Sequence, residues 1–338
     1  MNRYSRQVSF EPFGEKGQQR LRQSCAAVLG CGALGTAAAE MLARGGIGGL
    51  ILVDRDFVEE SNLQRQSLFT EEDAREGLPK AVAARQALQH LNSEVEVRAW
   101  VRDLEASNIA SLTEGCQILI DGTDNFETRF LINDYSVSRR IPWIYGAALG
   151  SFGVAMAIDS QAESPCLQCL MEELPLAGSV ETCETAGILA PAIHAVASFQ
   201  VAEALRFLSG SGFTGRILQA DTWTGSWRTV PLAAQRNPDC ECCAQGRFRY
   251  LEQAPAQSQA RLCGRNAVQL KPSRPGQVDL EGLARRLQPS LRVSCNQYLL
   301  RIGAEDCDIA LFRDGRSIIR GTEDLARARA LYSRYVGT

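Results

Sequence analysis

Short apolar runs alternate with longer helical patterns through the first two thirds of the chain. Alanine- and leucine-rich segments at 36–44 and 81–90 have the composition and length of helices. The apolar runs are typical of buried strands and lie at 26–29, 50–53 and 117–121. Strands and helices in alternation predict a Rossmann-like, doubly wound, mostly parallel α/β sheet over residues 1–246.

Later apolar runs follow a different pattern, because glycine-rich and polar connections separate them. The runs at 153–159, 216–220 and 226–231 therefore predict antiparallel strands added to the sheet. A polar, low-complexity segment at 247–262 is expected to be a linker. It precedes a small α+β module at 263–338, with elements expected at 280–287 (helix), 298–302, 309–312 and 317–320 (strands) and from 323 (helix). We find no internal repeat.

Three glycines stand between the first predicted strand and the first predicted helix. Gly30, Gly32 and Gly35 have the G-x-G-x-x-G spacing, and Asp54 follows Gly35 at the end of the second strand. Such glycines allow a tight turn and a close approach to phosphates, while an acid about 20 residues later binds ribose hydroxyls. The order of strand, glycines, helix, strand and acid predicts a nucleotide site.

Polar residues of both charges follow the second and third strands. The candidate nucleotide-binding set is Gly30, Gly32, Gly35, Asp54, Asp56, Asn62, Arg65, Gln66, Lys80, Asp124 and Asn125. Cations grouped with carboxylates suit a nucleoside triphosphate and its Mg²⁺ ion. Lys80 is one of only 3 lysines, whereas the chain has 33 arginines. A lysine at this position therefore favours a role for its compact charge in phosphate binding over a chance surface residue. The alternative, an NAD-dependent oxidoreductase, rests on the glycine loop alone and has no use for these cations.

The 12 cysteines fall into three groups. Cys166-x-x-Cys169 and Cys240-x-x-Cys243 have zinc-ligand spacing, although the gap of about 70 residues leaves spacing alone undecided. Cys183, in a polar stretch before a long apolar segment, is either a reactive thiol or an inert loop residue. Cys242 lies inside the second pair and could compete as a ligand, but Cys240 and Cys243 have the regular spacing. The other six cysteines are interpreted as small core side chains and are Cys25, Cys31, Cys116, Cys263, Cys295 and Cys307. Because the start has no apolar signal region and no run reaches membrane-spanning length, a reducing cytoplasm is expected.

These motifs together resemble the ThiF/MoeB/HesA adenylyltransferases, bacterial relatives of ubiquitin-activating enzymes. The resemblance covers residues 1 to about 246. It is carried by the stretches 3–7, 30–35, 54–56, 61–66, 79–80, 121–125, 141–146, 165–169 and 183–191 and by the later cysteine pair. The stretches 262–269 and 314–322 are similar to the extension of ThiF-type proteins of thiazole synthesis.

The resemblance implies ATP-dependent adenylation of the C-terminal glycine carboxylate of a ubiquitin-like sulfur carrier protein. For the nucleotide, it implies that Asp54 binds the ribose and that Asn62, Arg65 and Lys80 hold the phosphates. It implies further that Asp124 coordinates Mg²⁺ and that Arg6 reaches the partner's site in a homodimer. It also makes Cys183 a candidate for sulfur transfer from a cysteine desulfurase or rhodanese-type donor. The four paired cysteines become a structural Zn²⁺ site.

The proposed chemistry needs no strong base, since the carrier's carboxylate is ionised near neutral pH. This agrees with a chain of only two histidines, His90 and His194, of which we expect His194 to be structural in a buried helix. Residues 247–338 carry 16 Lys+Arg against 9 Asp+Glu. We favour packing or solubility over docking of an acidic carrier as the reason for this charge. No basic, aromatic-interleaved stripe indicates nucleic-acid binding.

Within the family resemblance, several functions stay open. Thiamine thiazole synthesis is favoured because of the tail, with activation of a molybdopterin-synthase carrier as the next choice. A tRNA-modifying relative that adenylates a small substrate is a third. A non-catalytic scaffold is disfavoured because every checked nucleotide position is filled.

Overall fold

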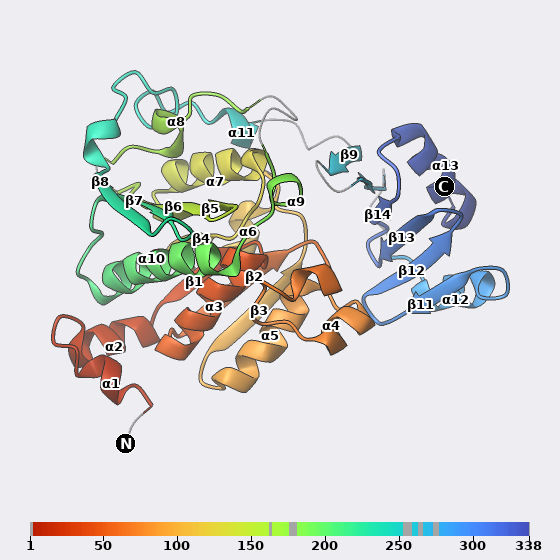
Figure 1. The fold of residues 1–338 in the computed structure, drawn as a ribbon, viewed down its shortest axis with the longest axis horizontal. Helices are drawn as coiled ribbons and strands as arrows, with labels where there is room; N and C mark the ends of the chain where they lie inside the picture. The colour runs from red at the N-terminus through yellow and green to blue at the C-terminus, as the bar shows by residue number, and fades with distance from the viewer. Residues whose placement is uncertain are drawn as a thin grey trace. The chain divides into compact units, whose positions relative to one another are not determined.

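The computed structural model describes residues 3–161, 164–175, 181–252, 259–262, 266–272 and 277–337. The chain divides into two compact units (Figure 1). Unit 1 comprises 1–175 and 186–254, and unit 2 comprises 176–185 and 255–338.

Unit 1 is built on an eight-stranded sheet of order β3-β2-β1-β4-β5-β6-β7-β8. The five strands from β3 to β5 pair in parallel, and β6, β7 and β8 are added antiparallel, as predicted. The strand bounds are β1 Cys25–Leu29, β2 Gly49–Asp54, β3 Glu96–Val101, β4 Ile118–Asp121, β5 Trp143–Leu149, β6 Phe152–Ile158, β7 Arg216–Asp221 and β8 Ser226–Pro231. The carboxyl ends of β1, β2 and β4 therefore meet at one edge.

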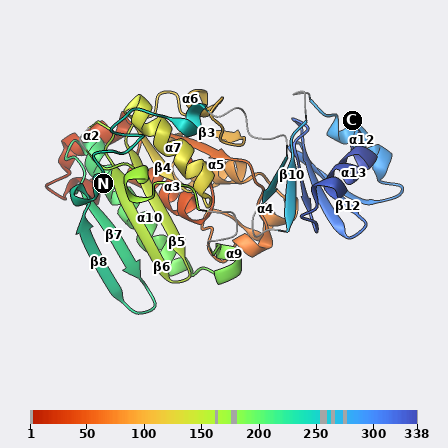
Figure 2. The same cartoon turned by 90° about the horizontal axis from the view of Figure 1, so that it is seen from above.

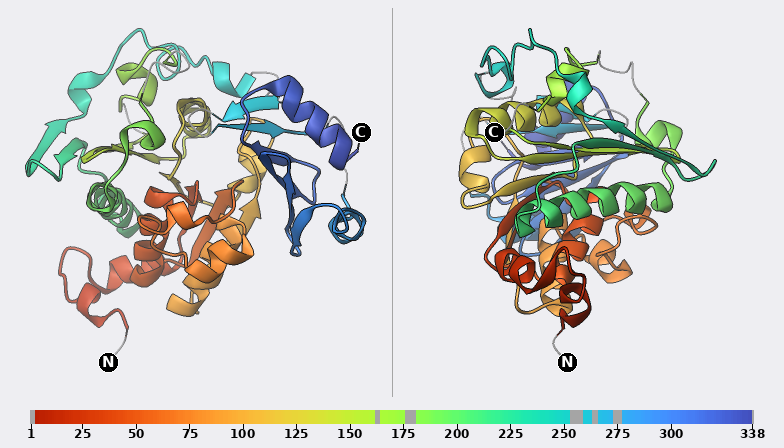
Figure 3. Two further views of the ribbon diagram at one scale, coloured as in Figure 1. Left: turned by 45° about the vertical axis from the view of Figure 1, so that its right-hand side comes forward. Right: turned by 90° about the vertical axis from the view of Figure 1, so that its left-hand side faces the viewer.

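Helices cover both faces of this sheet (Figure 3). One face packs on α2 (Gly14–Arg22), α3 (Ala33–Gly45), α5 (Lys80–Leu91) and α10 (Ala190–Ser209). The other face packs on α6 (Ile109–Leu112) and α7 (Phe126–Arg139). The shorter helices are α1 (Ser5–Val8), α4 (Glu71–Glu76), α8 (Leu167–Leu170), α9 (Cys183–Ala186) and α11 (Arg249–Glu252), with 3₁₀ turns at Glu60–Asn62 and Ala233–Gln235.

Strand β3 was not anticipated from the sequence. Its side chains alternate between charged or exposed and apolar positions, so that Val97 is buried while Glu96 and Arg98 are exposed. An edge strand has one solvated face and lacks the continuous apolar run of the central strands.

Unit 2 is an antiparallel six-stranded sheet of order β11-β12-β13-β14-β10-β9, with α12 (Leu280–Leu287) and α13 (Leu325–Tyr335) packed on one face (Figure 2). Its strands are β9 Gln259–Leu262, β10 Ala267–Leu270, β11 Arg292–Cys295, β12 Leu299–Ala304, β13 Cys307–Phe312 and β14 Ser317–Arg320. The predicted helices and the last three strands are present. The first three strands of unit 2, β9 to β11, were not predicted. Strand β9 lies at the end of the segment expected to be a linker, where its four residues pair with β10.

Two expectations about burial are wrong. His194 is exposed on α10, because it lies on the side of the helix facing away from the sheet core formed with Ile193 and Val196. Cys295 is exposed on β11, an edge strand of unit 2. Across the described part of the chain, none of the helices combines the length and apolar character needed to cross a membrane.

Candidate active site

The glycine loop packs directly against the turn that follows β4. Gly30 has a φ of +93°, which favours glycine, and a Cβ built there would lie 2.6 Å from the Gly122 carbonyl oxygen. A Cβ at Gly35 or at Gly122 would clash with the Gly30 carbonyl oxygen. The absence of side chains at these three positions brings the β1 and β4 turns together beside the N-terminus of α3.

The Asp54 carboxylate organises the glycine loop. Its Oδ2 accepts a hydrogen bond from the Cys31 backbone N–H at 2.6 Å, and its Oδ1 accepts one from the Asp56 N–H at 2.7 Å. Burial raises the pKa of the Asp54 carboxyl, and the charge of Lys80 opposes this rise. Each carboxylate oxygen retains capacity for a further hydrogen bond, which is what a ribose hydroxyl requires.

Lys80 is a nearly buried cation at the start of α5, with 6% of its surface exposed. Its Nζ lies 3.8 Å from Asp56 Oδ2, and its backbone N–H donates to the Asp56 carbonyl oxygen at 2.9 Å. Burying an ammonium group costs free energy unless a carboxylate lies near it. Asp56 therefore provides a carboxylate near the Lys80 ammonium group at the carboxyl edge of the sheet.

The turn at 59–66 is fixed by its own side chains. Asn62 is buried and its Oδ1 accepts the Glu59 backbone N–H at 3.2 Å, while Arg65 Nη1 donates to the Ser61 carbonyl oxygen at 2.8 Å. Gln66 is also buried, and its Oε1 has no hydrogen-bond partner among the described residues. A buried acceptor without a partner is costly, so Gln66 is suited to a ligand that carries a donor.

Asp124 is exposed in the turn after β4. An ion pair between Arg129 and Asp121, which was not predicted from the sequence, holds this turn in place. Arg129 Nε donates to Asp121 Oδ2 at 3.2 Å, and its Nη2 donates to the carbonyl oxygens of Thr123 at 2.8 Å and Gly146 at 3.0 Å. Burial raises the pKa of Asp121, and Arg129 opposes the rise. The available signal was an arginine eight residues after an acid that ends a predicted buried strand.

Asn125 has a structural task in this turn. It is the N-cap of α7, where its Oδ1 accepts the Thr128 backbone N–H at 2.9 Å. This bond satisfies one of the free N–H groups at the start of the helix. The side-chain oxygen of Asn125, a predicted nucleotide-binding residue, is thus engaged in the helix cap, and the side chain of the preceding Asp124 is exposed.

Arg6 lies apart from the other predicted site residues of its own chain. It is exposed on α1, and its neighbour Gln7 donates to the Gly45 carbonyl oxygen at the C-terminal end of α3. The glycine loop lies at the other end of α3. This helix has 13 residues, so its two ends are about 20 Å apart. Within one subunit, Arg6 therefore does not join the nucleotide site.

The two cysteine pairs converge as a possible metal centre. The sulfur atoms of Cys166, Cys169, Cys240 and Cys243 all lie within 4.8 Å of one another. Cys166 and Cys240 Sγ are 3.7 Å apart, and Cys169 and Cys243 Sγ are 3.4 Å apart. Four thiolates around one zinc ion have sulfur–sulfur separations of about 3.8 Å. The donor set and its spacing fit Zn²⁺.

Two adjacent residues of α7 support this cluster. Asn133 Oδ1 accepts the Leu167 backbone N–H at 2.7 Å, and its Nδ2 donates to the Cys242 sulfur at 3.3 Å. Asp134 accepts hydrogen bonds from Gln168 Nε2 at 2.6 Å and from the Tyr250 backbone N–H at 2.8 Å. Cys242, between the two cysteines of the second pair, thus contacts α7.

Cys183 begins α9, and its side chain lies outside the described residues. The Thr182 backbone N–H donates to Thr185 Oγ1 at 2.9 Å, which closes this short turn. The turn precedes α10, as the sequence indicated.

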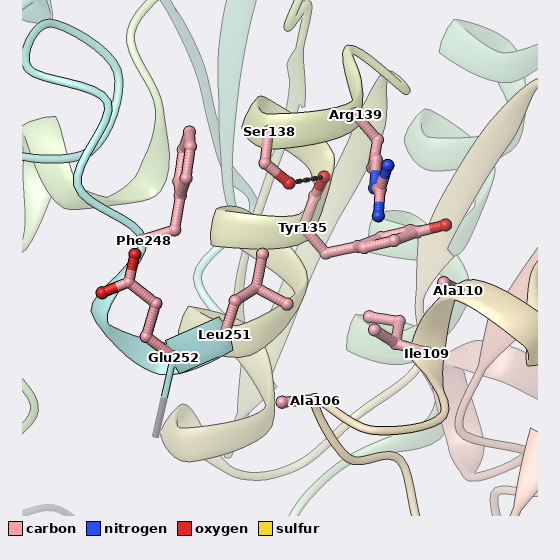
Figure 4. A pocket seen from close by; sticks show the side chains of 9 residues that line it. All are labelled: Ala106, Ile109, Ala110, Tyr135, Ser138, Arg139, Phe248, Leu251 and Glu252. Atoms are coloured by element: carbon pink, nitrogen blue, oxygen red, sulfur yellow. Dashed lines mark hydrogen bonds between the residues drawn. The ribbon is translucent and has the colours of Figure 1, made fainter. Parts of the chain in front are cut away.

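A separate surface cavity of about 390 Å³ lies between α6, α7 and α11. Tyr135, Ile109 and Leu251 line its apolar part, with Arg139 and Glu252 at its border (Figure 4). None of the predicted site residues lines it, so the cavity is no part of the candidate active site.

The ThiF family model matches residues 4–242 of this sequence. The chain belongs to the ThiF family. This ThiF-family protein is 44% identical to the sulfur carrier protein ThiS adenylyltransferase of Bacillus subtilis (strain 168) over 99% of both chains. It is 36% identical to the molybdopterin-synthase adenylyltransferase of Escherichia coli (strain K12), over 72% of this chain and 97% of that relative.

Solved structures agree on the fold of this ThiF-family protein. The crystal structure of E. coli MccB with ATP superposes with a TM-score of 0.63 at 23% identity and covers 72% of this chain and 74% of that one. At this identity the likeness concerns the fold alone. The family and the Rossmann-like architecture expected from the motifs are therefore confirmed.

Proposed function

We propose that this ThiF-family protein uses ATP to adenylate the C-terminal glycine carboxylate of a ubiquitin-like sulfur carrier protein and releases pyrophosphate. The observation that carries the proposal is the whole-length likeness to a ThiS adenylyltransferase, at 44% identity. Because this likeness includes unit 2, a ThiS-type carrier and thiamine thiazole synthesis are favoured. A MoaD-type carrier is the second candidate, since the molybdopterin-synthase relative matches over 72% of the chain.

The glycine loop and Asp54 form the proposed nucleoside end of the site. Gly30, Gly35 and Gly122 pack so closely that a side chain at any of them would clash with neighbouring backbone. The N-terminus of α3, which follows the glycine loop, offers free N–H groups to phosphate. Gly32 is the N-cap of that helix. Asp54, already fixed by two backbone N–H groups, binds the ribose.

The phosphates are proposed to lie against Asn62, Arg65 and Lys80. Lys80 forms an ion pair with Asp56, and Arg65 is tied to the 59–66 turn by its hydrogen bond to the Ser61 carbonyl oxygen. Bound Mg²⁺, coordinated by the exposed carboxylate of Asp124, would supply further charge neutralisation. The carrier carboxylate attacks the α-phosphorus, the bond to the bridging oxygen breaks, and pyrophosphate leaves; the positioned cations stabilise the charge that develops.

Arg6 is proposed to complete the site of a second subunit in a homodimer. Its exposure, together with its place at the far end of α3 from the glycine loop, supports action in trans. A guanidinium from a partner acts there as an arginine finger does, by adding positive charge at the transferring phosphate.

Sulfur transfer is proposed to follow adenylation. Cys183 attacks the acyl carbon of the acyl-adenylate and AMP leaves, or it attacks the outer sulfur of a persulfide on a cysteine desulfurase or rhodanese-type donor and the donor thiolate leaves. The four clustered cysteines are assigned to Zn²⁺ with a purely structural role, because their sulfur atoms lie within 4.8 Å of one another and α7 contacts both cysteine segments.

Pyrophosphate exchange into ATP tests the proposal. Purified protein is assayed with a ThiS-type carrier, a MoaD-type carrier, and each carrier without its terminal glycine. Exchange that requires one intact carrier is the expected result and identifies the pathway. Exchange that is insensitive to the terminal glycine, or absent with both carriers, would contradict it. Cys183→Ser is expected to retain exchange and lose thiocarboxylate formation.

A further inference from the structure

Two cysteines meet at the end of the sheet opposite the nucleotide site. Cys25 begins β1, Cys116 lies just before β4, and their sulfur atoms are 3.1 Å apart although 91 residues separate them in sequence. The site residues described above follow the carboxyl ends of the same two strands. The pair is therefore separate from the nucleotide site, and neither thiol belongs to the four-cysteine cluster.

The backbone holds the two cysteines in this position. The Gln117 N–H donates to the Cys25 carbonyl oxygen at 3.0 Å, and Gln117 Oε1 accepts the Cys25 N–H at 2.7 Å. The pairing of Ala26 with Ile118 continues this register into the parallel sheet. The contact between the sulfur atoms thus follows from strand pairing and does not depend on a flexible loop.

The two thiols differ in accessibility and in the direction in which their pKa values are shifted. Cys25 is partly exposed, whereas Cys116 is buried. The hydrogen bond between the two thiols lowers the pKa of the Cys25 thiol, burial opposes this, and the charge of Arg98 adds to the lowering. Because a thiolate is the reactive form of cysteine, the accessible Cys25 is assigned as the attacking thiol and the buried Cys116 as the thiol that closes the disulfide.

We propose that Cys25 and Cys116 are a redox-active dithiol, which hydrogen peroxide or an organic hydroperoxide converts into an intramolecular disulfide. The Cys25 thiolate attacks a peroxide oxygen and the O–O bond breaks. With one proton, a sulfenic acid is formed together with water from hydrogen peroxide, or with the alcohol from an organic hydroperoxide. Cys116 sulfur then attacks Cys25 sulfur, the S–O bond breaks, and the thiol proton leaves with the departing oxygen as water. Two thiols lose two electrons, and the peroxide gains them.

The disulfide would be reversible by a dithiol reductant through thiol–disulfide exchange. Its formation joins the beginning of β1 to the segment that leads into β4. Cysteines that bind zinc are held as metal thiolates, so the proposed dithiol is the pair expected to react first. Cys295, which is exposed but has no sulfur neighbour within the described residues, provides a matched single-thiol control.

Peptide mapping of the zinc-loaded full-length protein tests the proposal. The protein is treated with stoichiometric hydrogen peroxide, alkylated under denaturing conditions and digested with trypsin without reduction. Cleavage after arginine places Cys25 on the peptide 23–44 and Cys116 on the peptide 103–129. We expect these two peptides to be linked, with a mass about 2 Da below their sum, and to separate on treatment with a dithiol reductant.

Four variants identify the sulfur atoms. Cys31 shares the first peptide, so Cys31→Ser must retain the link, whereas Cys25→Ser and Cys116→Ser must lose it. In Cys116→Ser, the Cys25 sulfenic acid has no partner and is expected to be trapped by dimedone; Cys295→Ser must link as the unmodified protein does. Alkylation of both thiols after peroxide treatment, or a link that survives Cys25→Ser, would overturn the proposal. The mapping of unmodified protein decides the matter even if one variant does not fold.

Discussion

Arg129 and Asp121 form an ion pair at which neither side chain is open to solvent, with exposed side-chain fractions of 7% and 0%. The same guanidinium also binds the carbonyl oxygen of Thr123, the residue before Asp124. Gln200 Nε2 donates to the Asp121 carbonyl oxygen from α10 at 2.9 Å. The turn that carries Asp124 is thereby fixed from both faces of the sheet.

Replacing Arg129 is expected to destabilise the fold and to move this turn. Arg129→Met leaves a buried carboxylate without its counter-charge, which lowers the free energy of unfolding by about 3–5 kcal/mol. Urea unfolding measures the loss, and pyrophosphate exchange measures the displacement of Asp124. The neighbouring exposed arginine variant Arg139→Met serves as control on the same helix; an equal loss in both variants would contradict the assignment.

Asp124 is expected to matter for chemistry and not for folding. Asp124→Ala should reduce pyrophosphate exchange by at least about a hundredfold, because metal-bound charge stabilisation is lost, while the urea midpoint is unchanged. Glu127→Ala removes another exposed carboxylate of the same segment and should retain exchange. Full activity of Asp124→Ala would remove this residue from the proposed metal site.

The trans role of Arg6 can be tested by mixing inactive variants. Arg6→Ala and Asp124→Ala subunits are co-refolded in equal amounts and assayed for exchange. In each mixed dimer, one site combines an intact Asp124 with an intact Arg6 of the partner. Random pairing should therefore restore about one quarter of the unmodified activity. Arginine acting within its own subunit predicts no recovery.

Two glycines of α3 should respond in opposite ways to alanine. Gly35→Ala places a Cβ against the Gly30 carbonyl oxygen, so the glycine loop must shift and both ATP binding and stability must fall. At Gly45 the nearest atom to a new Cβ is Gln7 Oε1 at 3.5 Å, and its φ is not positive. Gly45→Ala should be neutral or stabilise by about 0.5–1 kcal/mol. Thermal unfolding with and without ATP distinguishes the two results.

Zinc content tests the cysteine cluster. We expect one Zn²⁺ per chain in the unmodified protein and its loss in Cys169→Ser, with a decrease in Tm of about 5 °C or more. Cys242→Ala removes a sulfur that contacts Asn133 and should retain the metal. Retention of a full equivalent of zinc by Cys169→Ser would refute the ligand assignment.

Elements that depend on local sequence were predicted, because a buried strand and a glycine turn each have a short signature. The first strand, the glycine loop and the following helix are examples, as are the two cysteine pairs. Arg129 was missed because its partners Asp121, Thr123 and Gly146 come from a turn and a neighbouring strand. No pattern within α7 specifies such contacts.

The pairing of Cys25 with Cys116 was unpredictable for a related reason. Each cysteine has apolar neighbours and was interpreted as a core residue. Only the register of β1 against β4, set by hydrogen bonds between segments 91 residues apart, brings the sulfur atoms together. Long-range register depends on the assembled sheet and is not encoded in either segment alone.

Helix α7 contacts two separate sites through residues that are about one helical turn apart. Arg129 faces the nucleotide turn, and four residues later Asn133 holds the arm that carries Cys166 and Leu167. Each residue of an α-helix advances the rotation by about 100°. An insertion of one residue between these positions would leave one of the two groups aimed in the wrong direction. The number of residues between Arg129 and Asn133 is therefore fixed by the two sites together. Surface side chains of this segment can be exchanged, but a residue cannot be added or deleted.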